Sequence, residues 1–433
     1  MKNVRHATLS LDKVVGGGQT IGTLADGRKA LVWGGLPGEE VEIQITKKKS
    51  RFVEGVVAQV LAASDERIEP LDPTSYLSTS PWQIMDFAAE QHYKAALIEE
   101  AFELHDIVLP NPIEVYTDGQ TVHYRNKVEF SWFGDTGEQG DILNLAFFHR
   151  GSKGKIVVDD CSLLPPPVMQ LARIIRDSLQ ARGASARQLK TLLIRCDQQG
   201  NCAWQLYVKD PDFDFIDATT ANALPALGGE IIYSDPKSPA SRITRRLASF
   251  GAPVLNDSIF GNHFQYSPES FFQVNLPVYK EALKDMMDWI TDGRLVDLYS
   301  GVGSIGLSIT KGSVDLVEID EHAVKEMRVN IASQQRSATA RAILAPSEKA
   351  LAYITSDAVI VVDPPRAGLH RDVIDRLLEV RPDCIIYLSC NPVTQARDIA
   401  LLSCVYGIRY HRGYNFFPRT PHIEHLIILY KKH

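Results

Sequence analysis

From residue 271 onward, the sequence alternates between runs that are nearly all apolar and segments with helical spacing. A strand that is apolar on both faces has to be covered on both sides, which is typical of a parallel sheet flanked by helices. The expected strands are Leu295–Tyr299, Asp315–Ile319, Ala358–Val362 and Cys384–Leu388. This pattern predicts a doubly wound, Rossmann-like α/β domain whose ligand lies at the carboxyl ends of the strands.

The first 270 residues follow a different pattern, so we predict a multidomain protein. Short strands punctuated by glycine between residues 7 and 62 indicate a small, OB-like closed β-barrel. Beyond a proline-containing stretch, strands mixed with the amphipathic helix Pro167–Arg182 indicate an α+β domain. The expected domains are therefore 1–62, 63–270 and 271–433, with a helix at 87–104 packing on the last of them.

Composition excludes several classes of protein. The chain has 433 residues, of which 45% are apolar and 23% charged, which is enough for folded cores. No run approaches the roughly 18 apolar residues of a membrane span, and Met1–His6 lacks the apolar stretch of a signal peptide. We therefore expect a cytoplasmic protein that does not bind membranes.

Charge leaves the question of nucleic-acid binding open. A formal net charge of -7 excludes a uniformly basic coat, but a local basic face can still attract a polyanion. The tract Lys47–Arg51 falls at an expected turn between two barrel strands. It is either a solvated hairpin tip or a contact for phosphate groups.

The six cysteines contain no CxxC pair, which argues against a zinc site and a disulfide framework. A lone cysteine is usually a small buried apolar residue, and that interpretation suits the four cysteines Cys196, Cys202, Cys384 and Cys404. Cys390 differs because Asn391-Pro392 breaks the chain directly after it. A helix starting near Thr394 is expected to lower its pKa from about 8.5, which makes Cys390 the best candidate nucleophile.

A glycine-rich turn follows the first strand of the α/β domain. Gly301, Gly303 and Gly306 form a GxGxxG pattern, and Glu318 ends the second strand. The glycines allow close approach of a ligand, and the carboxylate can accept hydrogen bonds from a ribose. The pattern favours an adenosine-containing cofactor without separating a nicotinamide dinucleotide from S-adenosylmethionine, and a tight turn without a ligand also remains open.

Two carboxylates are further candidates. Asp363 opens an Asp-Pro-Pro-Arg-Ala-Gly segment after the third of these strands, where the prolines stiffen the loop. Glu424 enters the start of an apolar strand near the C-terminus. The alternative interpretations are that Asp363 only caps the next helix and that Glu424 only pairs with a nearby cation.

Four ordered segments together resemble the RNA uracil-C5 methyltransferase family, which makes 5-methyluridine in ribosomal or transfer RNA. They are Asp297-Leu-Tyr-Ser-Gly-Val-Gly, Asp363-Pro-Pro-Arg-Ala-Gly, Leu388-Ser-Cys-Asn-Pro and Phe417-Pro-Arg-Thr-Pro-His-Ile-Glu. The likeness covers nearly the whole chain, since residues 7–62 look like a TRAM domain, an RNA-binding barrel. Segments that resemble family motifs also begin at Tyr124 and at Phe271.

The resemblance implies roles for individual residues. Cys390 is implied to be the nucleophile and Glu424 the general base. The remaining implied residues line the cofactor and base pocket, and they are Gln273, Tyr299, Gly301, Gly303, Glu318 and Asp363. The implied cofactor is S-adenosyl-L-methionine and the implied partner is RNA. From the length and the N-terminal barrel, we expect a monomer that methylates 23S rRNA during rRNA processing.

The sequence departs from the family pattern in three places. Family members often hold a [4Fe-4S] cluster on four cysteines. Only the fourth of them has a counterpart in this chain, which is Cys161, so we expect no cluster and no metal. The segment that usually contacts adenine reads Ala345-Pro-Ser-Glu. Arg419 replaces a common glutamine, and we expect its cation to bind a phosphate or to lower the pKa of Glu424.

Several alternatives stay open. A dinucleotide oxidoreductase explains the glycine turn but not Cys390 or Glu424. An exocyclic-amine methyltransferase needs no thiol, and a cytosine-C5 methyltransferase usually carries a second cysteine where Pro365 stands. A methyltransferase of transfer RNA and a non-catalytic RNA chaperone are the remaining candidates.

Overall fold

The computed structural model describes residues 5–137, 140–239, 241–291 and 293–432. The start of the N-terminal segment Met1–His6 therefore lies outside the described residues. Contacts divide the chain into two compact units. Unit 1 comprises residues 1–93, 120–253 and 417–422, and unit 2 comprises residues 94–119, 254–416 and 423–433.

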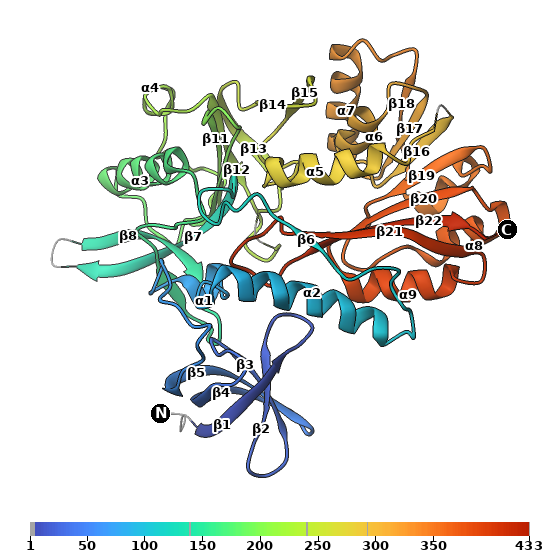
Figure 1. Cartoon of the computed structure of the whole chain (residues 1–433). Helices are drawn as coiled ribbons and strands as arrows, with labels where there is room; N and C mark the ends of the chain where they lie inside the picture. The colour runs from blue at the N-terminus through green and yellow to red at the C-terminus, as the bar shows by residue number, and fades with distance from the viewer. Residues whose placement is uncertain (1–4, 138–139, 240, 292, 433) are drawn as a thin grey trace. The chain divides into compact units, whose positions relative to one another are not determined.

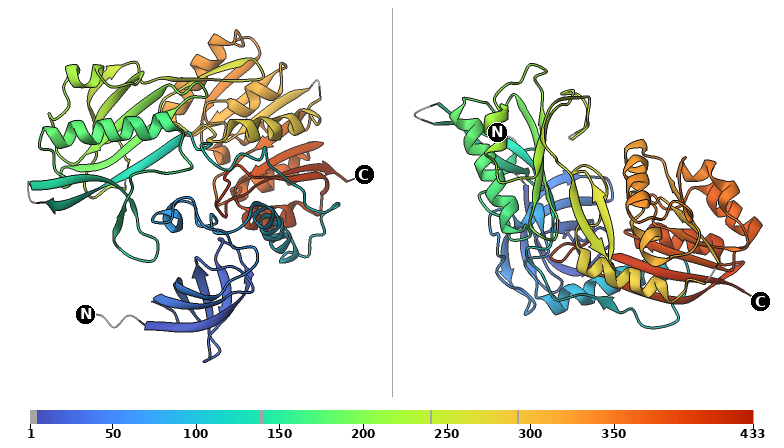
Figure 2. Two further views of the ribbon diagram at one scale, coloured as in Figure 1. Left: turned by 60° about the vertical axis from the view of Figure 1, so that its left-hand side comes forward. Right: turned by 90° about the horizontal axis from the view of Figure 1, so that it is seen from above.

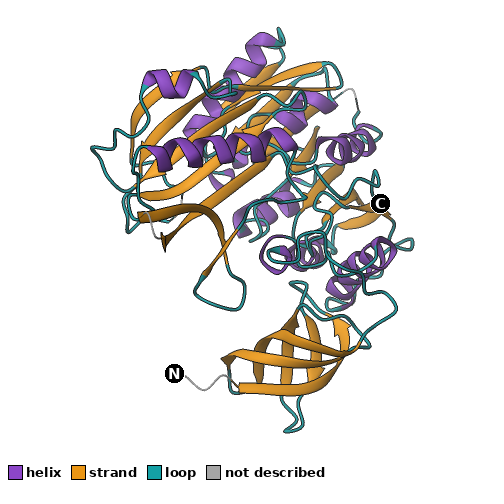
Figure 3. Ribbon diagram, turned by 90° about the vertical axis from the view of Figure 1, so that its left-hand side faces the viewer, coloured by secondary structure: helices purple, strands orange, loops and turns teal. Residues whose placement is uncertain are grey.

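Unit 1 begins with a closed five-stranded barrel. Figure 3 shows it as a group of orange strands that contains no helix. Its strands are β1 (Arg5–Val14), β2 (Thr20–Thr23), β3 (Lys29–Trp33), β4 (Glu40–Lys48) and β5 (Phe52–Ala62). Alternate side chains such as Val41 and Ile43 are fully buried in the barrel interior, as the period of a strand requires. The tract Lys47–Arg51 forms the β4–β5 turn, which Lys49 closes by donating its amide to Phe52 at 2.9 Å.

The remainder of unit 1 is built on a seven-stranded sheet with the order β13-β12-β11-β10-β7-β8-β9 (Figure 2). The strands are β7 (Lys127–Gly137), β8 (Gly140–Phe148), β9 (Lys155–Val157), β10 (Leu189–Cys196), β11 (Cys202–Val208), β12 (Gly228–Tyr233) and β13 (Arg245–Gly251). Short helices α1 (Tyr76–Thr79) and α4 (Ala218–Asn222) accompany the longer α3 (Pro166–Ala181). Val168, Ala172, Ile175 and Leu179 of α3 are buried at helical spacing, so this helix covers the sheet with its apolar face.

Unit 2 contains an eight-stranded sheet with the order β18-β17-β16-β19-β20-β22-β21-β6. Its strands are β6 (Val115–Tyr116), β16 (Arg294–Leu298), β17 (Val314–Glu318), β18 (Ala340–Leu344), β19 (Ala358–Val362), β20 (Cys384–Ser389), β21 (Tyr406–Tyr414) and β22 (Glu424–Lys431). A separate hairpin is formed by β14 (Leu255–Ile259) and β15 (Asn262–Tyr266). The strands β16 to β20 are parallel, and the order reverses between β16 and β19, which is where such sheets bind ligands.

Helices cover both faces of this sheet (Figure 1). They are α5 (Leu276–Met287), α6 (Ser304–Ile309), α7 (Glu321–Ser333), α8 (Arg371–Val380) and α9 (Pro392–Leu402), with the 3-10 turns η1 (Ser347–Lys349) and η2 (Leu351–Tyr353). The helix α2 (Phe87–Glu103) passes from unit 1 into unit 2 at residue 94. Its residues Ile98 and Phe102 share one apolar core with α8 and α9. Among the described residues, no helix is both long and apolar enough to cross a membrane.

Candidate active site

Three of the predicted site residues lie next to one another at the carboxyl ends of the parallel strands. Leu298 of β16 pairs with Val317 of β17 on one side and with Val362 of β19 on the other. Tyr299, Glu318 and Asp363 each follow one of these paired residues in the sequence. Since parallel strands end at one edge, this registration places three candidates in a row at the switch point of the sheet.

The glycine turn is built for a close approach. Gly301 and Gly303 have φ values of 55° and 86°, which a residue with a Cβ atom rarely adopts. Glu318 accepts a hydrogen bond from the amide of Gly301 at 2.9 Å and further bonds from Ile319 and Asp320 at 2.8 Å each. The turn and the end of β17 are therefore held together by backbone donors around one carboxylate.

Two residues that the sequence analysis did not single out complete this end of the sheet. Asp297 is fully buried, and its Oδ2 atom accepts from the Gly306 amide at 2.9 Å whereas its Oδ1 atom has no partner among the described residues. Burial raises the pKa of Asp297 to about 8. Ile319 is 65% exposed, which is unusual for an isoleucine next to a buried strand. Glu318 and the exposed side chain of Ile319 at the end of β17 suit the ribose hydroxyls and the flat base of S-adenosylmethionine, whereas the fully buried Asp297 supports the glycine turn through Gly306.

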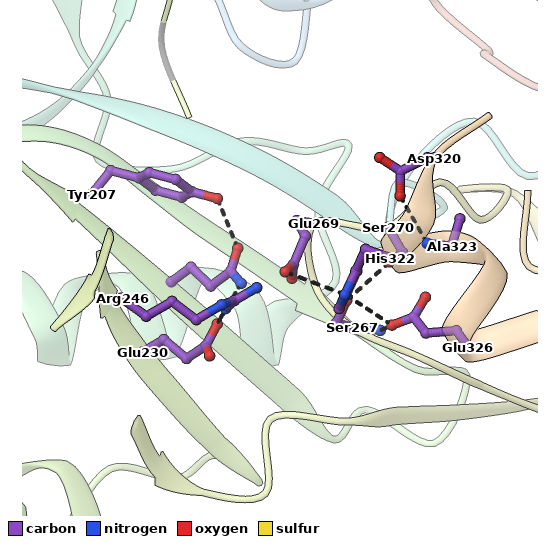
Figure 4. A network of polar contacts seen from close by, with 11 residues as sticks. Tyr207, Glu230, Arg246, Ser267, Glu269, Ser270, Asp320, His322, Ala323 and Glu326 are labelled. Carbon is purple, nitrogen blue, oxygen red and sulfur yellow. Dashed lines mark hydrogen bonds and ion pairs between the residues drawn. The ribbon is translucent and has the colours of Figure 1, made fainter. Parts of the chain in front are cut away.

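The segment that leads to Gln273 is bonded to helix α7 through Ser267, as Figure 4 shows for Ser267, His322 and Glu326. The Ser267 amide donates to Glu326 at 2.7 Å, and the Ser267 hydroxyl lies 2.8 Å from Nε2 of His322. A Cβ atom on Gly301 would lie 3.7 Å from the carbonyl of Phe271, so the same segment also lies beside the glycine turn. Gln273 itself is buried, with 5% of its surface exposed.

Cys390 and Glu424 face each other across an antiparallel ladder. Ser389 of β20 pairs with His425 of β22, and the two candidates are the adjoining residues at the same end of that ladder. Residues directly opposite in such a pair have Cβ atoms about 4.5–5.5 Å apart. Cys390 is partly exposed, whereas Glu424 is 4% exposed. The fold therefore brings together the two residues predicted to be nucleophile and base.

The pKa expected for Cys390 was wrong in direction. Burial, together with the nearby carboxyls of Glu424 and Asp363, raises the pKa of the thiol to about 12. Helix α9 does begin at Pro392, close to the expected position, but its partial charge is outweighed by burial and by two acidic neighbours. The thiol therefore keeps its proton in the protein without substrate.

The two carboxyls share this environment. Burial and then the neighbouring Asp363 raise the pKa of Glu424 well above its usual range, while Arg366 opposes that rise. Burial also raises the pKa of Asp363. Two buried carboxyls that repel each other's charge favour a state in which the pair keeps one proton. Arg366 is the cation of this site, and the sequence analysis missed it because the segment was interpreted through Asp363 alone.

The alternative role of Asp363 as a helix cap is wrong, whereas Glu424 does have the nearby cation that its alternative role requires. His370 is the N-cap of α8 and accepts from the Asp372 amide, so Asp363 does not cap that helix. Arg366 lowers the pKa of Glu424, but burial and Asp363 raise this pKa by more.

Tyr299, with φ of 66°, makes hydrogen bonds through its hydroxyl with Ser347 and with the backbone of His370.

The effect expected of Arg419 on the pKa of Glu424 was also wrong. Its guanidinium donates to the carbonyl of Met85 at 2.9 Å and lies 3.9 Å from the carboxylate of Glu90, and all three residues belong to unit 1. The pKa of Glu424 is raised rather than lowered, and Arg366 is the cation that acts on it. Arg419 is therefore a structural partner of Glu90.

The residues around Cys161 do not fit an iron–sulfur cluster. Burial raises the pKa of the Cys161 thiol to about 11, which disfavours the thiolate that a cluster needs. Ser162 donates its hydroxyl to Asp72 at 2.7 Å, and Gln83 donates to Asp72 at 2.9 Å. Within the described parts of the chain, no group of three metal-ligating side chains is found. Polar side chains that already satisfy one another occupy this position.

The other cysteines divide into two groups. Cys196, Cys202 and Cys384 are buried, as expected. Cys404 is exposed, so the expectation of a buried residue was wrong for that position. It follows the end of α9, where the chain turns toward β21 on the surface.

Comparison with known proteins agrees with this geometry. Residues 352–432 match the family model described as tRNA (Uracil-5-)-methyltransferase, which includes Asp363, Cys390 and Glu424. The chain is similar in sequence to RNA methyltransferases. An uncharacterized RNA methyltransferase of Nitratidesulfovibrio vulgaris is 26% identical over 458 residues, covering 98% of this chain and 96% of that protein. One from Enterococcus faecalis is 28% identical over 422 residues, covering 92% and 91%.

The fold of the present chain also matches a solved structure. The crystal structure of Pyrococcus abyssi tRNA (uracil-54, C5)-methyltransferase in complex with S-adenosyl-L-homocysteine superposes with a TM-score of 0.79. Sequence identity is 20%, and 97% of this chain and 100% of that chain are covered. The expected barrel, central α+β domain and Rossmann-like domain are thereby confirmed as the fold.

Proposed function

We propose that the protein is an S-adenosylmethionine-dependent RNA (uracil-C5)-methyltransferase that makes 5-methyluridine in the cytoplasm. The observation that carries the proposal is the position of Cys390 and Glu424 next to the last pair of the β20–β22 ladder, with Asp363 nearby. Neither an oxidoreductase nor an exocyclic-amine methyltransferase needs a thiol opposite a buried carboxyl. The proposal includes an RNA-binding barrel in residues 1–62, a central domain in 63–270 and a catalytic domain in 271–433.

The first step that this site has to perform is the activation of Cys390. Its raised pKa means that the thiol proton has to move to an acceptor, and the carboxyl pair Asp363–Glu424 is the nearest one that can take it. The thiolate then adds to C6 of the uracil, forming the S–C6 bond while the C5–C6 π electrons move onto O4. C5 thereby becomes nucleophilic. The target base has to leave any stack to reach this buried edge.

S-adenosylmethionine would be held by the glycine turn, Glu318 and Gln273, and would supply an electrophilic methyl group to C5 with S-adenosylhomocysteine as the leaving group. After a proton of the carboxyl pair has passed to water, Glu424 removes the proton from C5, and the electrons of that C–H bond restore the C5–C6 double bond and expel the Cys390 thiolate. A carboxyl with a raised pKa is suited to this step because it holds the abstracted proton firmly. No cluster or metal enters the reaction that we propose.

We further propose 23S rRNA as the target and a monomer as the active form, both from resemblance. The archaeal tRNA enzyme spans 97% of this chain, so chain length does not separate the two RNA classes and transfer RNA is the second candidate. Mapping 5-methyluridine in total RNA from cells with and without the protein tests both. Loss at one large-subunit rRNA position supports the first target, and loss in transfer RNA replaces it with the second. No methyl transfer to any RNA would contradict the enzymatic proposal and favour an RNA chaperone.

A further inference from the structure

The loop that carries Asp363 and Arg366 is held by a buried carboxylate on helix α9. Asp398 is fully buried, and no part of its side chain reaches solvent. Its Oδ2 atom accepts from the Leu369 amide at 2.8 Å and from the Tyr387 hydroxyl at 2.8 Å. Its Oδ1 atom accepts from Nε and Nη2 of Arg397 at 2.9 and 2.7 Å.

These bonds join three elements that meet at the site. Leu369 ends the loop after β19, Tyr387 lies on β20 three residues before Cys390, and Asp398 lies on α9. Arg397 adds a bond from Nη2 to the carbonyl of Ala367 at 2.9 Å. One carboxylate therefore ties the loop of the base pocket to the strand that ends at the thiol.

The start of α9 holds the same loop at a second point. The side-chain amide of Asn391 donates from Nδ2 to the carbonyl of Arg366 at 2.9 Å, and the Thr394 hydroxyl lies 3.2 Å from that carbonyl. At Gly368, with φ of 80°, a Cβ atom would lie 2.5 Å from Oδ2 of Asp398. The approach of the loop to Asp398 is thus so close that glycine is required at this position.

Close packing does not support the loop on this side. A cavity of about 520 Å³ lies between Tyr299, the loop from Pro365 to Arg371, and helices α8 and α9. An element that borders a cavity lacks contacts on that side, so hydrogen bonds have to define its position. The bonds to Asp398 and Arg397 define the position of the loop at its Leu369 end, and those from Asn391 and Thr394 define it at Arg366.

We infer that Asp398 is a positioning residue of the reaction, which sets the placement of the Asp363–Arg366 loop relative to Cys390. The inference rests on the proposed function. It does not involve the glycine turn, which follows β16, or Glu318, which ends β17. Loss of the Asp398 carboxylate therefore slows the reaction on the base while leaving the binding of S-adenosylmethionine unchanged.

The decisive variant is Asp398→Asn, which keeps the volume of the side chain. All four groups around Asp398 are donors, and an amide nitrogen cannot accept from any of them. We expect the single-turnover rate of methyl transfer to fall about 100-fold, the loss that a displacement of roughly 1 Å can cause. The dissociation constant for S-adenosylmethionine should stay within about twofold, a difference well under 1.4 kcal/mol.

A second readout uses RNA that contains 5-fluorouridine, with transcripts of large-subunit rRNA and of transfer RNA as the probes. Fluorine cannot leave C5 as a cation, so the Cys390 adduct persists after methyl transfer and can be counted on a denaturing gel. Asp398→Asn should form this adduct more slowly. Tyr387→Phe, which removes one donor, should have a smaller effect, and the double variant should be no slower than Asp398→Asn alone.

The matched control is Asp375→Asn, an exposed carboxylate of α8 that pairs with Arg371 on the surface and should leave the rate unchanged. Hydrogen exchange of the peptide containing Leu369 provides a measurement that needs no activity, and exchange should be faster in Asp398→Asn. Unchanged exchange, an unchanged rate, or equal losses of rate and cofactor affinity would overturn the inference. If Asp398→Asn does not fold, Tyr387→Phe serves for the same comparison. Wild-type protein without activity on any RNA would instead contradict the proposed function.

Discussion

The carboxyl edge of the sheet in unit 2 has two ends that differ in how they are built. At the cofactor end, formed by the ends of β16 and β17, Glu318 is surrounded by backbone donors, with the Gly301 amide at 2.9 Å. At the thiol end, formed by the ends of β19, β20 and β22, Cys390 and Glu424 are side chains whose pKa values are raised by burial and by acidic neighbours. The first end is ordered by backbone hydrogen bonds, whereas the groups of the thiol end hold their protons because of burial and of one another's charges.

This difference teaches where binding and reactivity come from in the molecule. Backbone amides keep their direction and charge at any pH, so the cofactor end should behave as a fixed receptor. The groups of the thiol end depend on one another's charges. Variants at the two ends should therefore separate affinity for the cofactor from the rate of reaction.

The largest effect is expected from Cys390→Ala. Without the sulfur atom no adduct can form, so methyl transfer should fall by about 10⁴-fold or more. Binding of S-adenosylmethionine, measured by calorimetry, should be unchanged because the cofactor end is intact. Cys404→Ala removes an exposed thiol and should react like the wild type. A Cys390→Ala protein with an undiminished rate would rule out the covalent route.

Glu424→Gln should slow the reaction by about 10²–10⁴-fold, the usual contribution of a positioned base. The proton on C5 then stays in place, so the protein should accumulate as a covalent complex with RNA, visible on a denaturing gel. Glu379→Gln alters an exposed carboxylate and serves as the control. Turnover at the wild-type rate, without a trapped complex, would assign the base to another residue.

Glu318→Gln tests the cofactor end alone. Loss of a charged acceptor weakens a hydrogen bond worth about 1.5–3 kcal/mol, so the dissociation constant for S-adenosylmethionine should rise about 10- to 100-fold. The rate at saturating cofactor should change little, since the thiol end is untouched. Glu321→Gln, at a surface pair with Lys325, is the matched control. A lower saturated rate with unchanged affinity would show that the two ends are not independent.

The smallest effect concerns the pH dependence of the thiol. With the pKa of Cys390 at about 12, only the thiolate fraction reacts, so alkylation by iodoacetamide should rise about tenfold per pH unit between pH 7 and 9. Asp363→Asn removes a charge that raises this pKa and should shift the profile to lower pH. Cys390→Ala provides the background from Cys404. A plateau near pH 7 would mean that the thiol is already ionised.

The cofactor end could be predicted from the sequence because its parts are local. The glycine turn follows its strand directly, and Glu318 ends the next strand. The pKa of Cys390 could not be predicted in this way. Helix α9 is adjacent in sequence, but Asp363 and Glu424, which determine the direction of the shift, come from other strands. Burial was likewise invisible in the sequence.

Arg419 and Asp398 show a second reason for failure. Both are charged residues whose partners lie far away in the sequence. The Arg419 amide donates to Glu90, 329 positions away, and Asp398 accepts from Leu369, 29 positions away. An aspartate in a helix is usually interpreted as a solvated residue. Only the folded chain shows that Asp398 is enclosed by four donors.

The ladder between β20 and β22 has a consequence for how this chain can change. Insertions in residues 403–405, between α9 and β21, leave the alignment of Ser389 with His425 intact as long as β20 and β22 keep their pairing. A slip by a single residue would turn Glu424 toward the opposite face of the sheet, because side chains alternate along a strand. Length variation in this stretch is therefore compatible with the proposed reaction, whereas a change in the registration of β20 and β22 is not.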